Sequence, residues 1–150
     1  MGLDQYLYAK KYTSKNFDEG QFETLKEALG TDIKYLDKQT PSISIQLKVG
    51  QWRKSNQIHQ YFVNNCQDGE DDCREVYVGR EKLAELLGLC KQVLDAPSGA
   101  KKVLPTQDGF FFGNTDYNEY YFADLKNTVE ILKNALTMDD DWEFSYQSSW

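Results

Sequence analysis

His59 is the residue of this sequence best suited to acid–base chemistry, because it is the only histidine among 150 residues. An imidazole titrates near neutral pH, so it can act as a general base or as a donor to a ligand. Cys66 and Cys73 follow it at intervals of seven residues, and a thiol beside the imidazole is the nucleophilic pairing that this sequence permits. Acidic neighbours disfavour the reactive thiolate form, and a histidine that packs within a helix is the simpler interpretation. The enzymatic hypothesis is a small hydrolase or transferase that uses His59 with Cys73 or with an aspartate.

The same residues do not form a metal-binding motif. Structural zinc sites use ligands paired two to four residues apart, and the spacing of His59, Cys66 and Cys73 contains no such pair. The acidic stretch at residues 68–72 lacks the ligand order and the closing Glu of a calcium loop. The sequence also lacks a phosphate-cradling glycine loop, a dinucleotide fingerprint and a serine elbow. We therefore predict neither a bound metal nor a cofactor.

Two segments combine aromatic side chains with polar groups and predict a ligand-binding site. In the first, Arg53 and Lys54 can hold an anion beside the ring of Trp52. In the second, residues 104–121, three phenylalanines lie between glycines and tyrosines follow, which offers flat faces and hydroxyl groups to a ring-bearing ligand. A buried strand joined to an amphipathic helix explains the same pattern without a ligand. The residues predicted to bind the ligand are Trp52, Arg53, Asn56, His59, Thr106, Phe111, Tyr120 and Tyr121.

Charge and composition favour some partners over others. The formal net charge of −7 disfavours direct binding of nucleic acid, which normally requires a basic patch or stripe. Acidic residues gather at positions 68–72 and 139–143. Such runs are usually solvated loops, and the functional alternative is a surface that occupies a basic, nucleic-acid-binding host protein. The aromatic residues, 14% of the chain, also fit a homo-oligomer interface as an alternative to a ligand cleft.

We expect a cytoplasmic protein without membrane contact. No stretch approaches the roughly 20 consecutive apolar residues that span a bilayer, and no basic region followed by an apolar run opens the sequence. Three cysteines without a short pairing motif fit reduced thiols better than a disulfide framework. The length suits a single domain over residues 1–150.

Hydrophobic periodicity predicts the elements that must position these residues. The clearest strand pattern is the alternation of Ile43, Ile45 and Leu47 with polar residues. Strands are expected at residues 4–12, 33–36, 43–49, 76–78, 110–112 and 142–147. Helices are expected at residues 18–30, 51–64, 80–94 and 116–136, with N-caps at Asp18 and Asp116. These elements make an α+β domain, in which about four helices pack on an antiparallel or mixed sheet of five to six short strands.

Several segments spread over the whole chain carry a likeness to known proteins: Met1–Asp4 with Tyr6–Tyr8, Trp52–Lys54 with Asn56, Ile58 and His59, Asp72–Cys73, Leu104–Thr106, Gly109–Gly113, Tyr120–Tyr121 and Gln147–Trp150. Together they resemble a group of small proteins encoded by tailed bacteriophages and prophages. The resemblance implies a viral origin and the host cytoplasm as the location, and it assigns no activity. An anti-defence role follows only by analogy with phage accessory proteins of this size.

Three hypotheses of function result, in order of preference. The first is a non-catalytic binding module for a small nucleotide-like or aromatic ligand. The second is an acidic interaction protein that blocks a basic host partner. The third is the enzyme that uses His59.

Overall fold

The computed structural model describes residues 2–30 and 41–150, and their class is α+β with one antiparallel sheet, as predicted. Within these ranges the chain forms four strands and five α-helices, where the sequence predicted five to six strands and about four helices. The elements in chain order are β1 (Asp4–Ser14), α1 (Glu19–Ala28), β2 (Ser42–Arg53), α2 (Asn56–Cys66), β3 (Val76–Val78), α3 (Arg80–Asp95), the 3-10 turn η2 (Pro97–Gly99), α4 (Ala100–Val103), α5 (Glu119–Leu136) and β4 (Glu143–Ser149).

The difference in strand number has two sources. The strand expected at residues 33–36 lies outside the described residues. The strand expected at residues 110–112 is wrong, because this segment turns: the Phe112 N–H donates to the Gly109 carbonyl over 3.0 Å, and Phe110 is 96% exposed. Gly113 follows with φ +86°, a conformation that favours glycine and redirects the chain. An apolar triplet between two glycines therefore forms a turn that buries one ring, that of Phe112.

The chain divides into two compact units. The smaller unit, residues 10–47, holds α1 with the part of β1 after Ala9 and the part of β2 before Lys48. Asp18 caps α1 as predicted, since its carboxylate accepts the Gln21 N–H at 2.9 Å, and the helix buries Phe22. The larger unit, residues 1–9 and 48–150, holds the remaining elements and every residue discussed below as a site.

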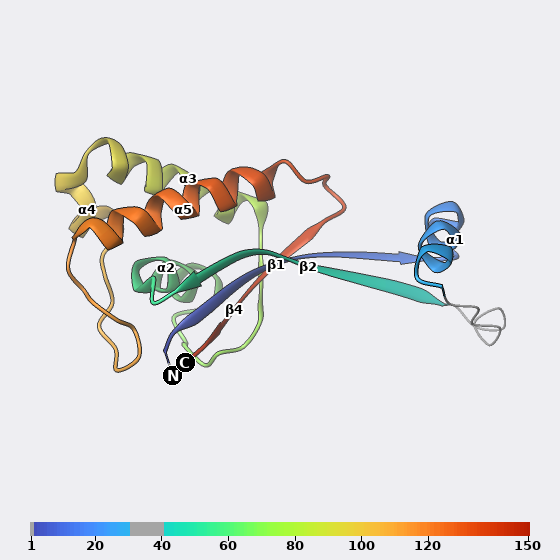
Figure 1. Ribbon diagram of the computed structural model, residues 1–150, viewed down its shortest axis with the longest axis horizontal. Coiled ribbons are helices and arrows are strands. Elements are labelled where there is room, and N and C mark those ends of the chain that lie inside the picture. The colour runs from blue at the N-terminus through green and yellow to red at the C-terminus, as the bar shows by residue number, and fades with distance from the viewer. Residues whose placement is uncertain (1, 31–40) are drawn as a thin grey trace. The chain divides into compact units, whose positions relative to one another are not determined.

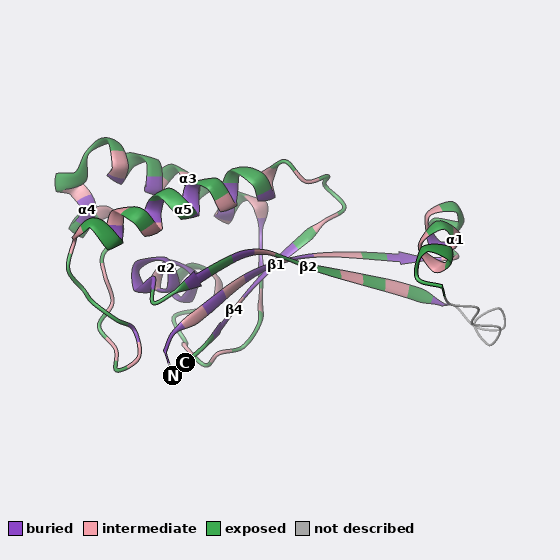
Figure 2. Ribbon diagram, in the orientation of Figure 1, coloured by how far each residue is buried: buried purple, intermediate pink, exposed green. Residues whose placement is uncertain are grey.

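In the larger unit the sheet positions helices that carry apolar stripes. The strand order is β2-β1-β4-β3, and β3 pairs antiparallel with β4, with Val76 opposite Tyr146. Helices α3 and α5 run along each other and pack together (Figure 1). The sequence predicts an apolar stripe on α3; four of its residues are buried and two, Leu87 and Leu94, are half-buried. The buried residues are Leu83, Leu86, Cys90 and Val93. Figure 2 shows that α2 is mostly buried, and its buried residues lie between Asn56 and Val63.

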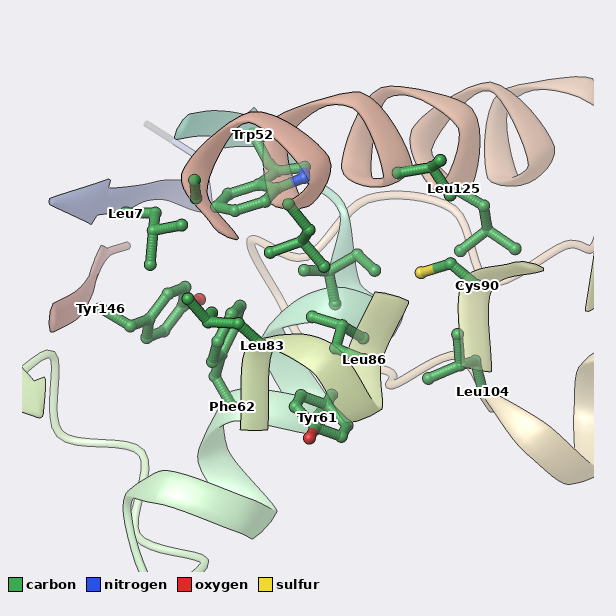
Figure 3. Packing of buried hydrophobic residues seen from close by; sticks show 14 of the residues in the cluster. Leu7, Trp52, Tyr61, Phe62, Leu83, Leu86, Cys90, Leu104, Leu125 and Tyr146 are labelled. Carbon is green, nitrogen blue, oxygen red and sulfur yellow. The ribbon is translucent and has the colours of Figure 1, made fainter. Parts of the chain in front are cut away.

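The core joins β2 to the helices through Trp52 (Figure 3). Its indole N–H donates to the Thr128 hydroxyl on α5 at 2.9 Å, while the rings of Phe62 and Tyr146 stack 4.1 Å apart. The prediction that Trp52 lies on a helix starting at residue 51 is wrong, since β2 continues through Arg53. Gly50 does not end this strand; a Cβ there would lie 2.6 Å from Ile131, so glycine is required for the close approach of α5.

The start of α5 differs from the prediction because another residue caps the helix. Helix α5 starts after Asn118, whose side chain accepts the N–H groups of Tyr120 and Tyr121, so the predicted N-cap at Asp116 is wrong. Asp116 instead donates its own backbone N–H to the side chain of Asn114. Asparagine and aspartate are about equally favourable as N-cap residues, so residue type alone does not distinguish Asp116 from Asn118. The path of the loop before α5 decides which of the two caps the helix.

Candidate functional site

A pocket of about 280 Å³ lies where β2 ends and where α2 and α5 begin. We call it the Arg53 pocket. It brings together three of the residues predicted to bind a ligand, Arg53, Tyr120 and Tyr121. Its lining comprises Arg53, Lys54, Gln57, Gly113, Asn114, Asp116, Asn118, Tyr120, Tyr121 and Asp124.

Two cations come from the end of β2 and the residue after it. Arg53 is well exposed and lies 3.9 Å from the carboxylate of Asp4. Lys54 has φ +58°, a left-handed conformation that is unfavourable for a lysine. A Cβ at Gly113 would lie 3.0 Å from the side chain of Lys54, and a Cβ at Gly2 would lie 3.1 Å from its Cε. The lysine side chain is therefore packed against two glycines, and the fold holds it in a strained conformation.

The first turns of α5 supply an aromatic ring and a carboxylate. Tyr120 is 73% exposed, so its ring is open to a ligand. Tyr121 is buried and donates its hydroxyl to the Leu104 carbonyl at 2.8 Å, which ties the loop before α5 to the core. Asp124 is one helical turn after Tyr120, so both side chains fall on the same face of α5.

Asp124 is partly withdrawn from solvent against α2. The amide of Gln57, which is only 3% exposed, donates to the Asp124 carboxylate at 3.4 Å. Burial raises the pKa of Asp124, and the side chains of Ser55 and Gln57 oppose that rise. The pocket thus combines two cations, Arg53 and Lys54, with two carboxylates, those of Asp116 and Asp124.

Asn56 fixes the loop that forms one wall of the Arg53 pocket. Its amide nitrogen donates to the carbonyls of Phe112 at 3.1 Å and Asn114 at 2.9 Å, and its oxygen accepts the Gln107 N–H at 3.0 Å. The side chain is buried. Because its amide is occupied by backbone groups, Asn56 acts here as a positioning residue.

The structure places the other predicted ligand residues away from the Arg53 pocket. Trp52 lies in the core. Thr106 donates its hydroxyl to the Thr115 carbonyl at 2.9 Å, which closes the loop between α4 and α5. The Phe111 carbonyl accepts the Leu3 N–H at 3.1 Å, so this residue joins the loop to the start of the chain.

His59 lies at the centre of a hydrogen-bonded chain that we call the His59 relay. Its Nδ1 is 2.8 Å from the Tyr146 hydroxyl and its Nε2 is 2.9 Å from the Asp71 carboxylate, while the Trp150 indole N–H donates to the other Asp71 oxygen at 3.1 Å. The edge of the imidazole also meets Phe112, with ring centroids 5.1 Å apart. The imidazole is 1% exposed, so both of its nitrogens are used within the fold.

The thiols are poorly placed for the nucleophilic hypothesis. Burial raises the pKa of Cys66 to about 11 and that of Cys90 to about 12, which keeps both thiols protonated at neutral pH. Cys73 is a half-buried free cysteine. Nor do residues 2–30 and 41–150 bring three or more His, Cys, Asp or Glu side chains together as metal ligands.

The acidic stretches are partly neutralised by neighbouring arginines. Arg74 lies within 4.0 Å of the carboxylates of Asp68, Glu70 and Asp72. Arg80 lies 4.0 Å from Asp140 and donates to backbone carbonyls of the same stretch. These surface pairs contribute little stability, but they reduce the negative potential of the two loops.

Sequence reasoning missed Gln57, Asn118 and Asp124 as pocket residues. Asp124 was detectable in principle, because it follows Tyr120 by four residues on the helix predicted at residues 116–136. Gln57 was not, because the helix there was expected to begin five residues too early.

Comparisons with models of protein families, with curated proteins and with solved structures find no match to this chain. None of the helices in the described part of the chain combines the length and the apolar composition that crossing a bilayer requires.

Proposed function

We propose that this protein is a non-catalytic binding module that holds a small nucleotide-like ligand in the Arg53 pocket. The observation that carries the proposal is the convergence of Arg53, Lys54 and Tyr120 on one cavity. An arginine and a lysine suit a phosphate group, and an exposed tyrosine ring suits a base. The phage resemblance adds the expectation that the ligand is a signal of host defence, which the protein would sequester.

Isothermal titration of the full chain with purine and pyrimidine nucleoside monophosphates tests the proposal. We expect saturable binding to the wild-type protein and at least tenfold weaker binding to Arg53→Gln and to Tyr120→Ala. Matched controls are Lys101→Gln, an exposed cation outside the pocket, and Tyr77→Ala, whose ring is 67% exposed. Equal affinity of all four variants, or no binding of any nucleotide, would contradict the proposal.

A second candidate function is the acidic interaction protein. Residues 10–47 contain as many basic as acidic residues, so the formal charge of −7 lies entirely on the larger unit. A charged unit of this kind suits a basic partner. It ranks below the first because Arg74 and Arg80 already pair with the acidic stretches. Pull-downs from host lysate at low and high salt test it, and recovery of no basic protein would count against it.

A further inference from the structure

The charges that line the Arg53 pocket restrict the chemical class of its ligand. The cations Arg53 and Lys54 share the cavity with the carboxylates of Asp116 and Asp124. A ligand that carried only anionic groups would meet repulsion from these carboxylates. The complementary ligand therefore has an anionic end and a second end that donates hydrogen bonds.

Asp124 is the acceptor best fixed in place. Its backbone belongs to α5, and the buried Gln57 amide donates to one of its oxygens at 3.4 Å. An ionised carboxylate only accepts hydrogen bonds, and its roughly four acceptor positions are more than the side chains of Ser55 and Gln57 can fill. The remaining positions line a pocket whose exposed ring, Tyr120, precedes Asp124 by one helical turn on the same face.

Among the common bases, guanine presents the matching edge. Its ring N–H and its neighbouring amino group are two adjacent donors, which a single carboxylate can accept together. The corresponding edge of adenine offers one donor beside one acceptor, and that acceptor would face the carboxylate lone pairs. A site that hydrogen-bonds a group discriminates strongly against a ligand that lacks it, because the buried polar atom then has no partner.

We propose that the Arg53 pocket selects a guanine nucleotide, in which Asp124 accepts the two donors of the base, Tyr120 stacks on the ring, and Arg53 with Lys54 binds the phosphate. This inference rests on the proposed function of the same site and adds the identity of the base. The strained backbone of Lys54 fits it, since left-handed residues held by the surrounding fold often occur at ligand sites.

Titration of the wild-type chain with GMP, IMP and AMP tests the inference. IMP retains the ring N–H of GMP and lacks its amino group, so it isolates one of the two hydrogen bonds. We expect GMP to bind roughly tenfold more tightly than IMP and still more tightly than AMP. Equal affinities for the three nucleotides would overturn the choice of guanine and leave nucleotide binding intact. Failure of all three to bind would overturn the proposed function itself.

The Asp124→Asn variant separates the carboxylate from other causes of selectivity. We expect it to lose the preference for GMP over AMP while it keeps a comparable affinity for AMP. The matched control is Glu130→Gln, an exposed carboxylate farther along α5 that should leave the preference unchanged. An Asp124→Asn protein that keeps the full preference would overturn the role of Asp124. If this variant does not fold, the comparison of GMP with IMP on the wild-type chain still decides the inference.

Discussion

The Arg53 pocket and the His59 relay both depend on α2, yet they use its polar residues in opposite ways. In the relay, each nitrogen of the only imidazole has a partner within the fold, at 2.8 Å and 2.9 Å. In the pocket, Gln57 fixes one carboxylate, while Arg53 and Tyr120 stay exposed. A single residue of α2, Ile58, separates Gln57 from His59. The imidazole of the relay is buried with both nitrogens paired, whereas the Arg53 pocket keeps a cation and a ring exposed.

The difference shows that a reactive residue type does not by itself indicate a site. His59 has the chemistry of a catalyst, but burial and two partners assign it to the core. Arg53 is a residue type common on protein surfaces, but its position at the end of β2 places it in one pocket with the ring of Tyr120 and the partly buried carboxylate of Asp124. Unused hydrogen-bonding capacity next to a cavity distinguishes the two regions, and each prediction below tests that distinction.

The largest effect is expected from His59→Ala. The substitution leaves a cavity, and it removes one partner of the Tyr146 hydroxyl and one partner of the Asp71 carboxylate. The free energy of unfolding should fall by about 3 kcal/mol, measured by urea denaturation. Gln60→Ala, on the same helix and partly exposed, should change it by less than about 1 kcal/mol. Nucleotide affinity of the folded fraction should be unchanged, and a stable His59→Ala protein with lost binding would move His59 into the functional site.

Asn56→Ala should affect both regions, with a loss of about 2 kcal/mol in the free energy of unfolding. Three hydrogen bonds to the backbone of residues 107–114 disappear, and the carbonyls of Phe112 and Asn114 lose a donor. The loop wall of the Arg53 pocket then loosens, so nucleotide affinity should fall as well, by titration calorimetry. Asn127→Ala on the exposed face of α5 is the control. Unchanged affinity would mean that the loop wall does not contribute to the site.

Much of the fold follows from periodicity in the sequence. The apolar residues Leu83, Leu86 and Cys90 recur at helical spacing and are buried in α3, because an amphipathic helix packs with its apolar face toward the core. Local patterns failed where a tertiary contact decided the outcome. A glycine at position 50 is typical of a strand end, yet β2 continues through it. Glycine is needed there because α5 lies so close that a side chain at this position would clash with Ile131.

The candidate site was predictable only in part. Arg53, Tyr120 and Tyr121 were predicted as ligand residues, and the fold brings them to one pocket. Trp52 and His59 have the same residue types as ligand-binding side chains, and the sequence does not reveal that their polar atoms are satisfied by Thr128, Tyr146 and Asp71. Hydrogen bonds between residues tens of positions apart depend on the assembled fold, which a local pattern does not encode.

Lys54→Gly should separate stability from binding at the Arg53 pocket. Glycine adopts φ +58° without strain, so the free energy of unfolding should rise by about 0.5 to 1 kcal/mol in urea denaturation. Nucleotide affinity should fall, because a cation is lost. The control Lys126→Gly, on the exposed face of α5, should lower stability by about 1 kcal/mol. A Lys54→Gly protein that is less stable and binds as before would show that the strain has no link to the site.

The smallest effect concerns pH and the Asp124 carboxyl. Burial raises its pKa above 3.8 in the folded protein, so the folded state holds this proton to higher pH than the unfolded state does. Its contribution to stability is therefore present below pH 3.8 and is lost as pH rises through the folded pKa. Relative to Asp124→Asn, the wild type should gain stability as the pH is lowered through this window, in urea denaturation at a series of pH values. Arg53, Lys54 and Asp116 share the pocket, so Asp116→Asn serves as the second reference. GMP affinity should fall over the same window, because a protonated carboxyl accepts fewer hydrogen bonds, and a pH-independent affinity would separate Asp124 from the base.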